Sequence, residues 1–327
     1  SASLDRRHDL RRRDWARHPL YLHNRRAWAG GAIHGKSRSL DSRPTTCSGG
    51  DRRGAVAPIS AVGHTRVGWH GAGGNRHGVV DALAREQGVS LARLLGGTPK
   101  PIPAYGAIGY DGAAESARVA EGWVKRGFSG VKAKIGYPEL REDVEVVRAI
   151  RNAVGRGVAI MVDYNQSLTP VEAVSRIEAL EEFDLTWAEE PVLAHDFEGH
   201  AFVANAVRTP IQCGENWWGP LDVRHAIRAG ASDYVMPELM KIGGVSGWRA
   251  AAALAEAHSI RMSNHLWPEV SAQVLSTSPM AYWLEYSDWW NPILAEPLAV
   301  ERGLALATDG PGSGIAWNER AVDRWLA

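Results

Sequence analysis

The chain has 327 residues, 45% of them hydrophobic, and its 37 Lys and Arg balance its 37 Asp and Glu. This length is enough for one large barrel with a small additional domain. No apolar run reaches the about 18 residues of a membrane span, and the arginine-rich N-terminus lacks the apolar stretch of a secretory signal. We therefore expect a cytoplasmic protein with no membrane partner. The two cysteines, Cys47 and Cys213, are far apart and favour neither a disulfide framework nor a thiolate zinc site.

The segment 1–79 differs in composition from the rest of the chain. Residues 1–80 contain 14 Arg and one Lys against five Asp and no Glu, and they hold seven of the twelve His. They show no sustained helical or alternating apolar pattern, so disorder is the plain expectation. A basic arm that binds nucleic acid is an alternative. Because the arginines are scattered without aromatic interleaving or a recognisable module, no nucleic-acid partner is expected.

A third interpretation of this segment concerns the gene. Sequence rich in Arg, Gly, Ala, Ser, His and Pro, free of Glu and changing abruptly into patterned sequence, is typical of a GC-rich reading frame translated out of register. This is the leading hypothesis for the segment. It predicts that a one-nucleotide shift in the coding DNA upstream of about Val80 restores a patterned α+β sequence, whereas a shifted frame full of stop codons would contradict it.

A regular apolar pattern begins at Val79. Apolar residues recur at helical spacing as far as Leu95 and are followed by two glycines, which predicts a helix over about 80–95. Beyond Pro101, short β-rich runs alternate with amphipathic stretches. The expected strands cover 131–135, 158–163, 186–189, 211–215, 233–237, 261–265 and 282–285. The helix-like stretches between them include 139–154, 170–181, 220–229 and 247–258.

Alternation of strands and helices over almost 200 residues indicates a parallel sheet, because each parallel connection needs a crossover helix. A closed barrel and an open doubly wound sheet are the two candidates. Neither GxGxxG nor GxxxxGK[ST] follows the first strand, so the nucleotide-binding open sheets lack their fingerprint. The barrel is therefore favoured.

Polar residues stand where the expected strands end. They are Lys132 and Lys134, then Asp163, Glu189, Glu215, Glu238, His265 and Glu285. From Asp163 onward they recur every 20 to 27 residues, about one strand–helix unit, which in a (β/α) barrel puts them at the C-terminal mouth where active sites lie. Lys132 and Lys134 are two positions apart on an extended strand, so their side chains point the same way. One such Glu is more often a helix cap or a loop ion pair, but recurrence at the barrel period favours a site.

Three of these carboxylates, Asp163, Glu189 and Glu215, come from successive strands and would repel one another unless a cation neutralised them. Oxygen ligands without Cys or His suit Mg²⁺ better than Zn²⁺, and Mn²⁺ could substitute. The two lysines, and His265 with Glu285, flank this site from the first and last strands. A metal-bound carboxylate substrate would have an acidified α-proton, so the implied chemistry is proton abstraction next to a carboxylate.

At these residues the chain resembles the enolase superfamily and, within it, the mandelate racemase subgroup, over about residues 80–327. The matching segments are Val131-Lys132-Ala133-Lys134-Ile135-Gly136, Met161-Val162-Asp163-Tyr164-Asn165-Gln166, Trp187-Ala188-Glu189-Glu190-Pro191, Gly214-Glu215-Asn216-Trp217, Met240-Lys241-Ile242-Gly243-Gly244, Ser263-Asn264-His265 and Trp283-Leu284-Glu285. The resemblance implies an α/β fold with a modified (β/α)7β TIM barrel over 101–327. It also implies an N-terminal α+β capping domain, of which only the last helix within 80–100 is recognisable, and a homo-oligomer.

The resemblance also implies roles for the residues at the strand ends. Asp163, Glu189 and Glu215 would be the Mg²⁺ ligands. Lys134 would be the base on the (S) face of the substrate, and His265 would be the base on the (R) face. The implied partner is a small-molecule carboxylate.

Four further residues receive roles from the same resemblance. Lys132 would neutralise the substrate carboxylate, Glu285 would hydrogen-bond the developing enediolate as an electrophilic acid, and Asn165 would contact the α-hydroxyl side. Glu238 stands where the family pairs an Asp with its catalytic His. The added methylene keeps the charge, but a base displaced by about 1 Å can cost on the order of 10²-fold in rate.

The expected function is a Mg²⁺-dependent racemase of a 2-hydroxy carboxylate that works through an enediolate, with mandelate or a related aryl or vinyl glycolate as first candidate. The presence of both Lys134 and His265 favours racemisation. The alternative is an acid-sugar dehydratase, because the same enediolate can expel a β-hydroxyl group. A non-enzyme alternative is an impaired product that lacks a working cap.

Overall fold

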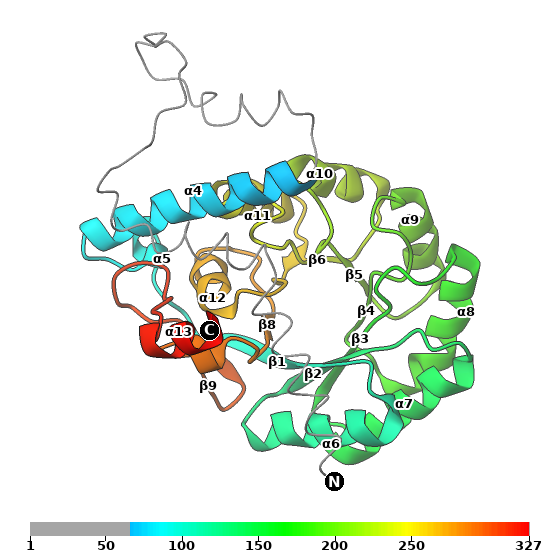
Figure 1. Cartoon of the computed structure of the whole chain (residues 1–327). Helices are drawn as coiled ribbons and strands as arrows, with labels where there is room; N and C mark the ends of the chain where they lie inside the picture. Colours follow the sequence, from blue (N-terminus) through cyan, green and yellow to red (C-terminus); the bar gives the residue numbers. More distant parts are fainter. Residues whose placement is uncertain (1–65, 327) are drawn as a thin grey trace.

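A ring of parallel strands forms the centre of the fold (Figure 1). The structure is a computed structural model and describes residues 66–326. The strands of the ring are β1 (Ile102–Ile108), β2 (Gly130–Lys134), β3 (Ala159–Asp163), β4 (Trp187–Glu189), β5 (Ile211–Cys213), β6 (Tyr234–Val235), β7 (Arg261–Met262) and β8 (Leu284–Tyr286). Each strand from β1 to β6 pairs in parallel with the next along the chain, and β8 pairs with β1. A parallel bridge from Met262 to Ala281 brings β7 beside the segment before β8, so the ring closes.

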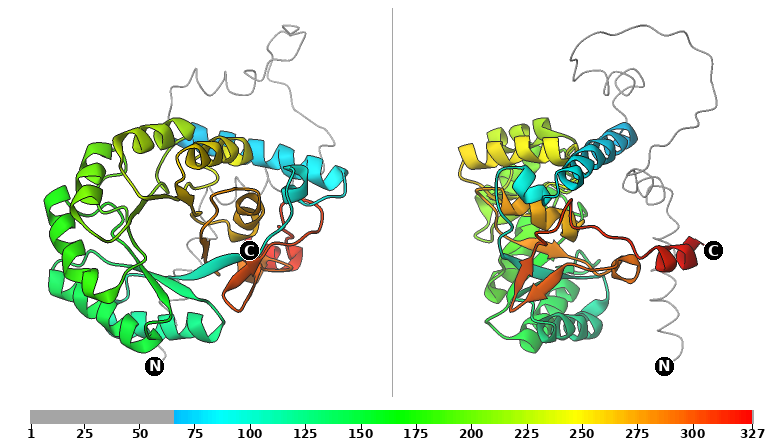
Figure 2. Two further views of the ribbon diagram at one scale, coloured as in Figure 1. Left: turned by 180° about the vertical axis from the view of Figure 1, so that it is seen from behind. Right: turned by 90° about the vertical axis from the view of Figure 1, so that its left-hand side faces the viewer.

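Helices cover the outside of this ring (Figures 1 and 2). They are α6 (Gly112–Lys125), α7 (Leu140–Val154), α8 (Pro170–Leu180), α9 (Phe197–Ala206), α10 (Pro220–Ala229), α11 (Gly244–Ala257) and α12 (Pro268–Ser276), with 3-10 turns at η1 (Glu181–Phe183) and η2 (Asn291–Ile293). Local sequence explains where they start: Thr169 and Glu172 form a capping box around Pro170 at the head of α8. The architecture is the predicted modified TIM barrel of (β/α)7β type.

Alternate residues of each barrel strand face opposite sides. In β3, Ile160 and Val162 belong to the core between barrel and helices, whereas Met161 packs inside the barrel with Tyr105 and Trp187. Asp163 therefore lies on the inner side of its strand. The same alternation places Lys132 and Lys134 of β2 on the inside, as their spacing predicts.

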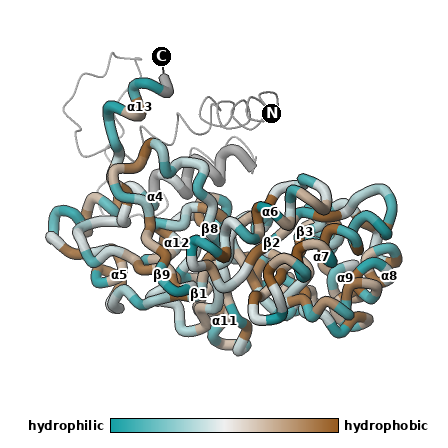
Figure 3. Tube along the Cα trace, turned by 90° about the horizontal axis from the view of Figure 1, so that it is seen from below, coloured by the Kyte–Doolittle hydropathy of each residue, from teal (hydrophilic) through white to brown (hydrophobic). Residues whose placement is uncertain are grey.

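Further elements surround the barrel. They are α4 (Arg66–Glu86), α5 (Leu91–Leu94), the antiparallel pair β9 (Ala299–Glu301) and β10 (Leu304–Leu306), and α13 (Glu319–Leu326). β10 pairs antiparallel with the start of β1, and α4 lies against α11. Figure 3 shows α13 as a largely hydrophilic helix at the edge of the molecule, and its Ala321 and Val322 are buried against Ile293. None of the helices within residues 66–326 is long and apolar enough to cross a membrane.

The predicted helix over about 80–95 is wrong in its extent. α4 ends at Glu86 and α5 begins only at Leu91, because Gly88 adopts a left-handed backbone with φ of 68° and Ser90 caps the new helix. α4 also begins at Arg66, inside the segment expected to be unpatterned. Residues 1–65 lie outside the described part of the chain, so disorder, a basic arm and a shifted reading frame stay predictions.

Candidate active site

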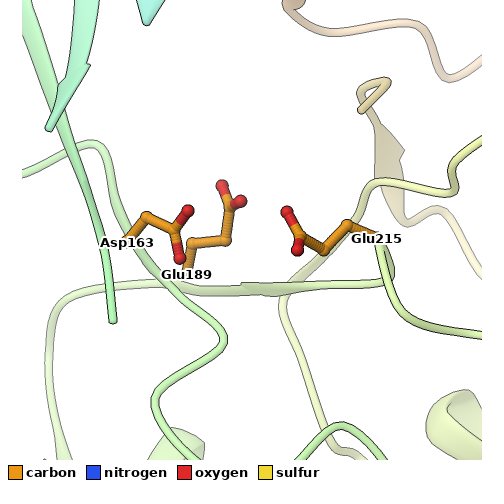
Figure 4. A group of neighbouring side chains, drawn as sticks. All are labelled: Asp163, Glu189 and Glu215. Atoms are coloured by element: carbon orange, nitrogen blue, oxygen red, sulfur yellow. The ribbon is translucent and has the colours of Figure 1, made fainter. Parts of the chain in front are cut away.

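Three carboxylates meet at the C-terminal end of the barrel (Figure 4). Asp163 and Glu189 are the last residues of β3 and β4 and are register partners, and Glu215 lies just beyond β5. One oxygen from each lies within 4.8 Å of the others, and all three side chains are buried. Figure 4 shows the carboxylates directed toward one shared space. The structure thus brings together the residues that sequence spacing predicted to converge.

The charges around this triad are unevenly compensated. Burial raises the pKa of Glu189 well above its usual range, with further contributions from Asp163 and Glu215, although Lys132 opposes the rise. Burial alone would also raise the pKa of Glu215, but the positive charges of His265 and the nearby lysines outweigh burial and lower it to about 2. Glu215 Oε2 is buried and accepts no hydrogen bond, although His265 Nε2 lies 3.1 Å from it. A hard divalent cation would coordinate this oxygen and neutralise the cluster, so the donor set fits Mg²⁺.

Lys132 compensates much of the buried negative charge. Its side chain is 4% exposed, and its Nζ lies 2.5 Å from Glu189 Oε1, 2.8 Å from Glu285 Oε1 and 3.7 Å from Asp163 Oδ2. Burial would lower the pKa of Lys132, but the negative charges of Glu189 and Glu285 raise it well above its usual range. The ammonium group therefore contacts protein carboxylates here, and its contact with a substrate carboxylate stays a prediction.

Lys134 stands two residues further along β2 and is more accessible, with 41% of its side chain exposed. Its Nζ lies 3.3 Å from Asp163 Oδ2 and donates to Asn165 Oδ1. Asn165 in turn donates its backbone N–H to Asp163 Oδ1 at 2.8 Å, from a left-handed turn with φ of 44°. Lys134 and Asn165 thus lie together at the Asp163 side of the triad, and their roles toward a substrate stay predictions.

His265 lies at the other side of the triad, beyond β7. Its Nε2 is 3.1 Å from Glu215 Oε2, and its side chain is 17% exposed. Its Nδ1 is buried and has no hydrogen-bond partner. The imidazole therefore contacts a metal-ligand candidate through Nε2, while nothing described in residues 66–326 hydrogen-bonds the other ring nitrogen.

Glu238 stands where the family pairs an Asp with its catalytic His, but its carboxylate hydrogen-bonds other residues. One carboxylate oxygen accepts from the indole N–H of Trp267, and the other accepts from the backbone N–H of Lys241 at 2.6 Å. Backbone pairing does place Glu238 beside His265, since the two form a parallel bridge. The Glu238 side chain instead contacts Lys241, in the same loop after β6, and Trp267, the residue just before α12.

Glu285 comes from β8 and is buried. Its Oε1 pairs with Lys132, and its Oε2 accepts the backbone N–H of Leu266 at 2.9 Å. Burial would raise the pKa of Glu285, but the positive charges of Lys132 and His265 lower it below its usual range. Glu285 is therefore ionised in this state, whereas an electrophilic acid must carry a proton, and that role stays a prediction.

Three residues near the triad were not given roles from sequence. Asn216 donates to Glu215 Oε1 at 2.9 Å and to Glu190 Oε2 at 2.7 Å, and Lys241 Nζ donates to Asn216 Oδ1 at 2.9 Å. Burial, together with the negative charge of Glu215, raises the pKa of Glu190 to about 8. The sequence did contain a signal for two of these residues, because Glu190 and Asn216 each directly follow an expected metal ligand.

Comparisons with known proteins show which family the chain resembles. Residues 115–321 match the Enolase C-terminal domain-like family. The L-talarate/galactarate dehydratase of Salmonella typhimurium is 32% identical over 280 residues, which cover 80% of this chain and 69% of the relative. A Bradyrhizobium enolase solved with magnesium and mandelic acid is 42% identical, with a TM-score of 0.79 over 83% of this chain and 75% of that one. The L-talarate dehydratase of Polaromonas, solved with Mg and L-glucarate, is 29% identical, with a TM-score of 0.78 over 83% and 76%.

Proposed function

The chain belongs to the enolase superfamily, in the group related to mandelate racemase, and we propose that it removes the α-proton of a 2-hydroxy carboxylate to form an enediolate. It is a Mg²⁺-dependent enzyme of that superfamily. One observation carries the proposal: Lys134 lies 3.3 Å from Asp163 and His265 lies 3.1 Å from Glu215. Two groups that can exchange protons therefore flank different ligands of the same triad.

Asp163, Glu189 and Glu215 would hold the metal ion. Bound Mg²⁺ would make the α-proton of a coordinated carboxylate more acidic by stabilising the negative charge that develops. A lysine that has lost its proton is a base, and Lys134 is exposed enough to reach a substrate from the barrel mouth. Lys132, buried beside the triad, would supply a fixed positive charge next to the substrate carboxylate.

Racemisation is the first net reaction that this arrangement supports. Lys134 takes the α-proton, the C–H electron pair moves into the enediolate, and His265 returns a proton to the opposite face. The Bradyrhizobium enolase, which is 42% identical, was solved with mandelic acid, and this favours an aryl 2-hydroxy acid as substrate.

Dehydration of an acid sugar is the second candidate, favoured by a different observation. Glu238 hydrogen-bonds Trp267 and Lys241, so it does not orient His265 for work as a base. A dehydratase needs one base and one acid: Lys134 removes the α-proton, the electron pair expels the β-hydroxyl group, and a proton from His265 completes the water. The enol then becomes a 2-oxo-3-deoxy acid. Two of the similar proteins are an L-talarate/galactarate dehydratase and an L-talarate dehydratase.

Proton NMR in D₂O tests the proposal and separates the two reactions. The full chain is incubated with saturating Mg²⁺ and, in separate tubes, (R)-mandelate, (S)-mandelate, galactarate and L-talarate. Loss of the α-proton signal from both mandelates supports racemisation, whereas a 2-oxo-3-deoxy product from a sugar diacid supports dehydration. Absence of exchange from all four by a protein that binds Mg²⁺ would contradict both.

A further inference from the structure

A chain of hydrogen bonds links the loops that follow β4, β5 and β6. Asn216 lies at its centre: its amide nitrogen donates to Glu215 Oε1 at 2.9 Å and to Glu190 Oε2 at 2.7 Å, and its amide oxygen accepts from Lys241 Nζ at 2.9 Å. A reversed amide would place its oxygen against two carboxylates and its nitrogen against an ammonium group. The orientation of the Asn216 side chain is therefore set by all three neighbours.

Lys241 is itself held in place through its backbone. Its N–H donates to Glu238 Oε2 at 2.6 Å, and its carbonyl accepts from Gly219 N–H at 3.1 Å. These two contacts fix the turn from which the ammonium group reaches Asn216. Glu238, which does not pair with His265, thereby supports the residue that anchors Asn216.

The hydrogen bond from Asn216 gives the two carboxylate oxygens of Glu215 different surroundings. Oε1 accepts a hydrogen bond from the amide, whereas Oε2 is buried, accepts no hydrogen bond and lies 3.1 Å from His265 Nε2. One oxygen of Glu215 lies within 4.8 Å of an oxygen from each of Asp163 and Glu189. Because Asn216 holds Oε1, the Glu215 carboxylate presents a single orientation to a cation.

We propose that Asn216, anchored by Lys241, is a positioning residue that holds Glu215 for metal binding and thereby sets the preference of the site for Mg²⁺ over Ca²⁺. The inference rests on the proposed function, since it takes Glu215 as a metal ligand. Mg²⁺ requires near-ideal octahedral geometry, whereas Ca²⁺ accepts longer bonds and variable coordination. Loosening one ligand should therefore weaken Mg²⁺ binding more than Ca²⁺ binding.

The test is isothermal titration of the metal-free full chain with MgCl₂ and, separately, with CaCl₂. Asn216→Ala removes the donor to Glu215, and we expect its Mg²⁺ Kd to rise about tenfold or more, with a smaller rise for Ca²⁺. Lys241→Met keeps Asn216 but removes its anchor, so the same shift should appear at smaller size. Matched controls are Asn205→Ala on α9, whose amide donates to Ala201 O, and Lys125→Met, whose side chain is 76% exposed.

Each outcome decides the proposal. Equal weakening of Mg²⁺ and Ca²⁺, or no change in either, overturns the positioning role while leaving the proposed function intact. If the wild-type chain binds no Mg²⁺, the proposed function fails and the positioning role fails with it. If thermal melting shows that Asn216→Ala does not fold, the ratio of the two dissociation constants in Lys241→Met decides: a fall in Mg²⁺ preference supports the role, and an unchanged ratio overturns it.

Discussion

The two proposed bases differ in what surrounds them. Lys134 is exposed and contacts Asn165 and Asp163, whereas His265 is mostly buried and contacts Glu215. Because each would serve one face of the substrate, Lys134→Ala should slow α-proton exchange from (S)-mandelate by about 10²–10⁴-fold and leave exchange from (R)-mandelate much less affected. His265→Asn should do the reverse. The measurement is proton NMR in D₂O for each enantiomer.

Metal binding provides the control for this pair of variants. Isothermal titration should show that each variant still binds Mg²⁺, because neither side chain is a metal ligand in the proposal. Equal loss of exchange from both enantiomers in both variants would contradict the assignment of one base to each face.

A second residue-scale prediction concerns His200, a buried histidine on α9. Burial lowers its pKa below the ordinary 6.5, and the hydrogen bond from Nδ1 to Asp196 O opposes this only in part. The unfolded chain therefore binds more protons than the folded chain as pH falls below about 6.5, so stability present above that pH is lost on acidification. Thermal melts between about pH 5 and 8 should show a smaller loss for His200→Gln than for the wild type.

The matched control is the exposed His195. His195→Gln should follow the wild-type dependence of melting temperature on pH, because the His195 side chain is exposed and its replacement removes no buried imidazole. Parallel curves for His200→Gln and the wild type would contradict the argument.

At the scale of elements, β1 and α6 approach unusually closely at Gly106. A Cβ built at Gly106 would lie 2.1 Å from the Trp123 ring, whose indole N–H donates to Ala107 O at 3.0 Å. Gly106→Ala should push α6 from the sheet and lower the free energy of unfolding by about 1–3 kcal/mol or more. Gly122→Ala, which meets no atom within 4 Å on α6, should raise it by about 0.5–1 kcal/mol. Urea unfolding measures both, and equal effects would contradict the proposed clash.

A comparison of β3 and β4 with β1 shows why some strands were predictable from the sequence and others were not. β3 and β4 carry uninterrupted buried runs that end in Asp163 and Glu189, a signal contained within each strand. β1 was not among the expected strands, because Pro103 and Gly106 resemble a loop. Glycine is required at position 106 because a helix more than ten residues later in the chain packs against it. This requirement depends on tertiary structure and leaves no local signal of a strand.

The limits of prediction at the site have a similar cause. The convergence of the triad follows from one residue per strand at the barrel period, which sequence spacing reveals. The partner of Glu238 does not follow from spacing, because Trp267 and His265 both lie beyond β7 and only their side-chain placement decides between them. The same holds for Lys241 and Asn216, which come from different loops.

At the scale of the whole molecule, metal binding and folding should be coupled, since the triad joins three strands of the ring. A metal ion that binds the folded chain but not the unfolded chain raises the free energy of unfolding by about 2.7 kcal/mol when its concentration is 100 times the Kd. For a domain of this size that corresponds to a rise of about 5–10 °C in Tm.

Melting followed by circular dichroism in EDTA and in increasing MgCl₂ should show this rise. Glu215→Gln should abolish it, whereas Glu256→Gln, on the exposed side of α11, should retain it. A Mg²⁺-dependent rise of wild-type size in Glu215→Gln would show that the ion stabilises the chain elsewhere and would remove Glu215 from the metal site.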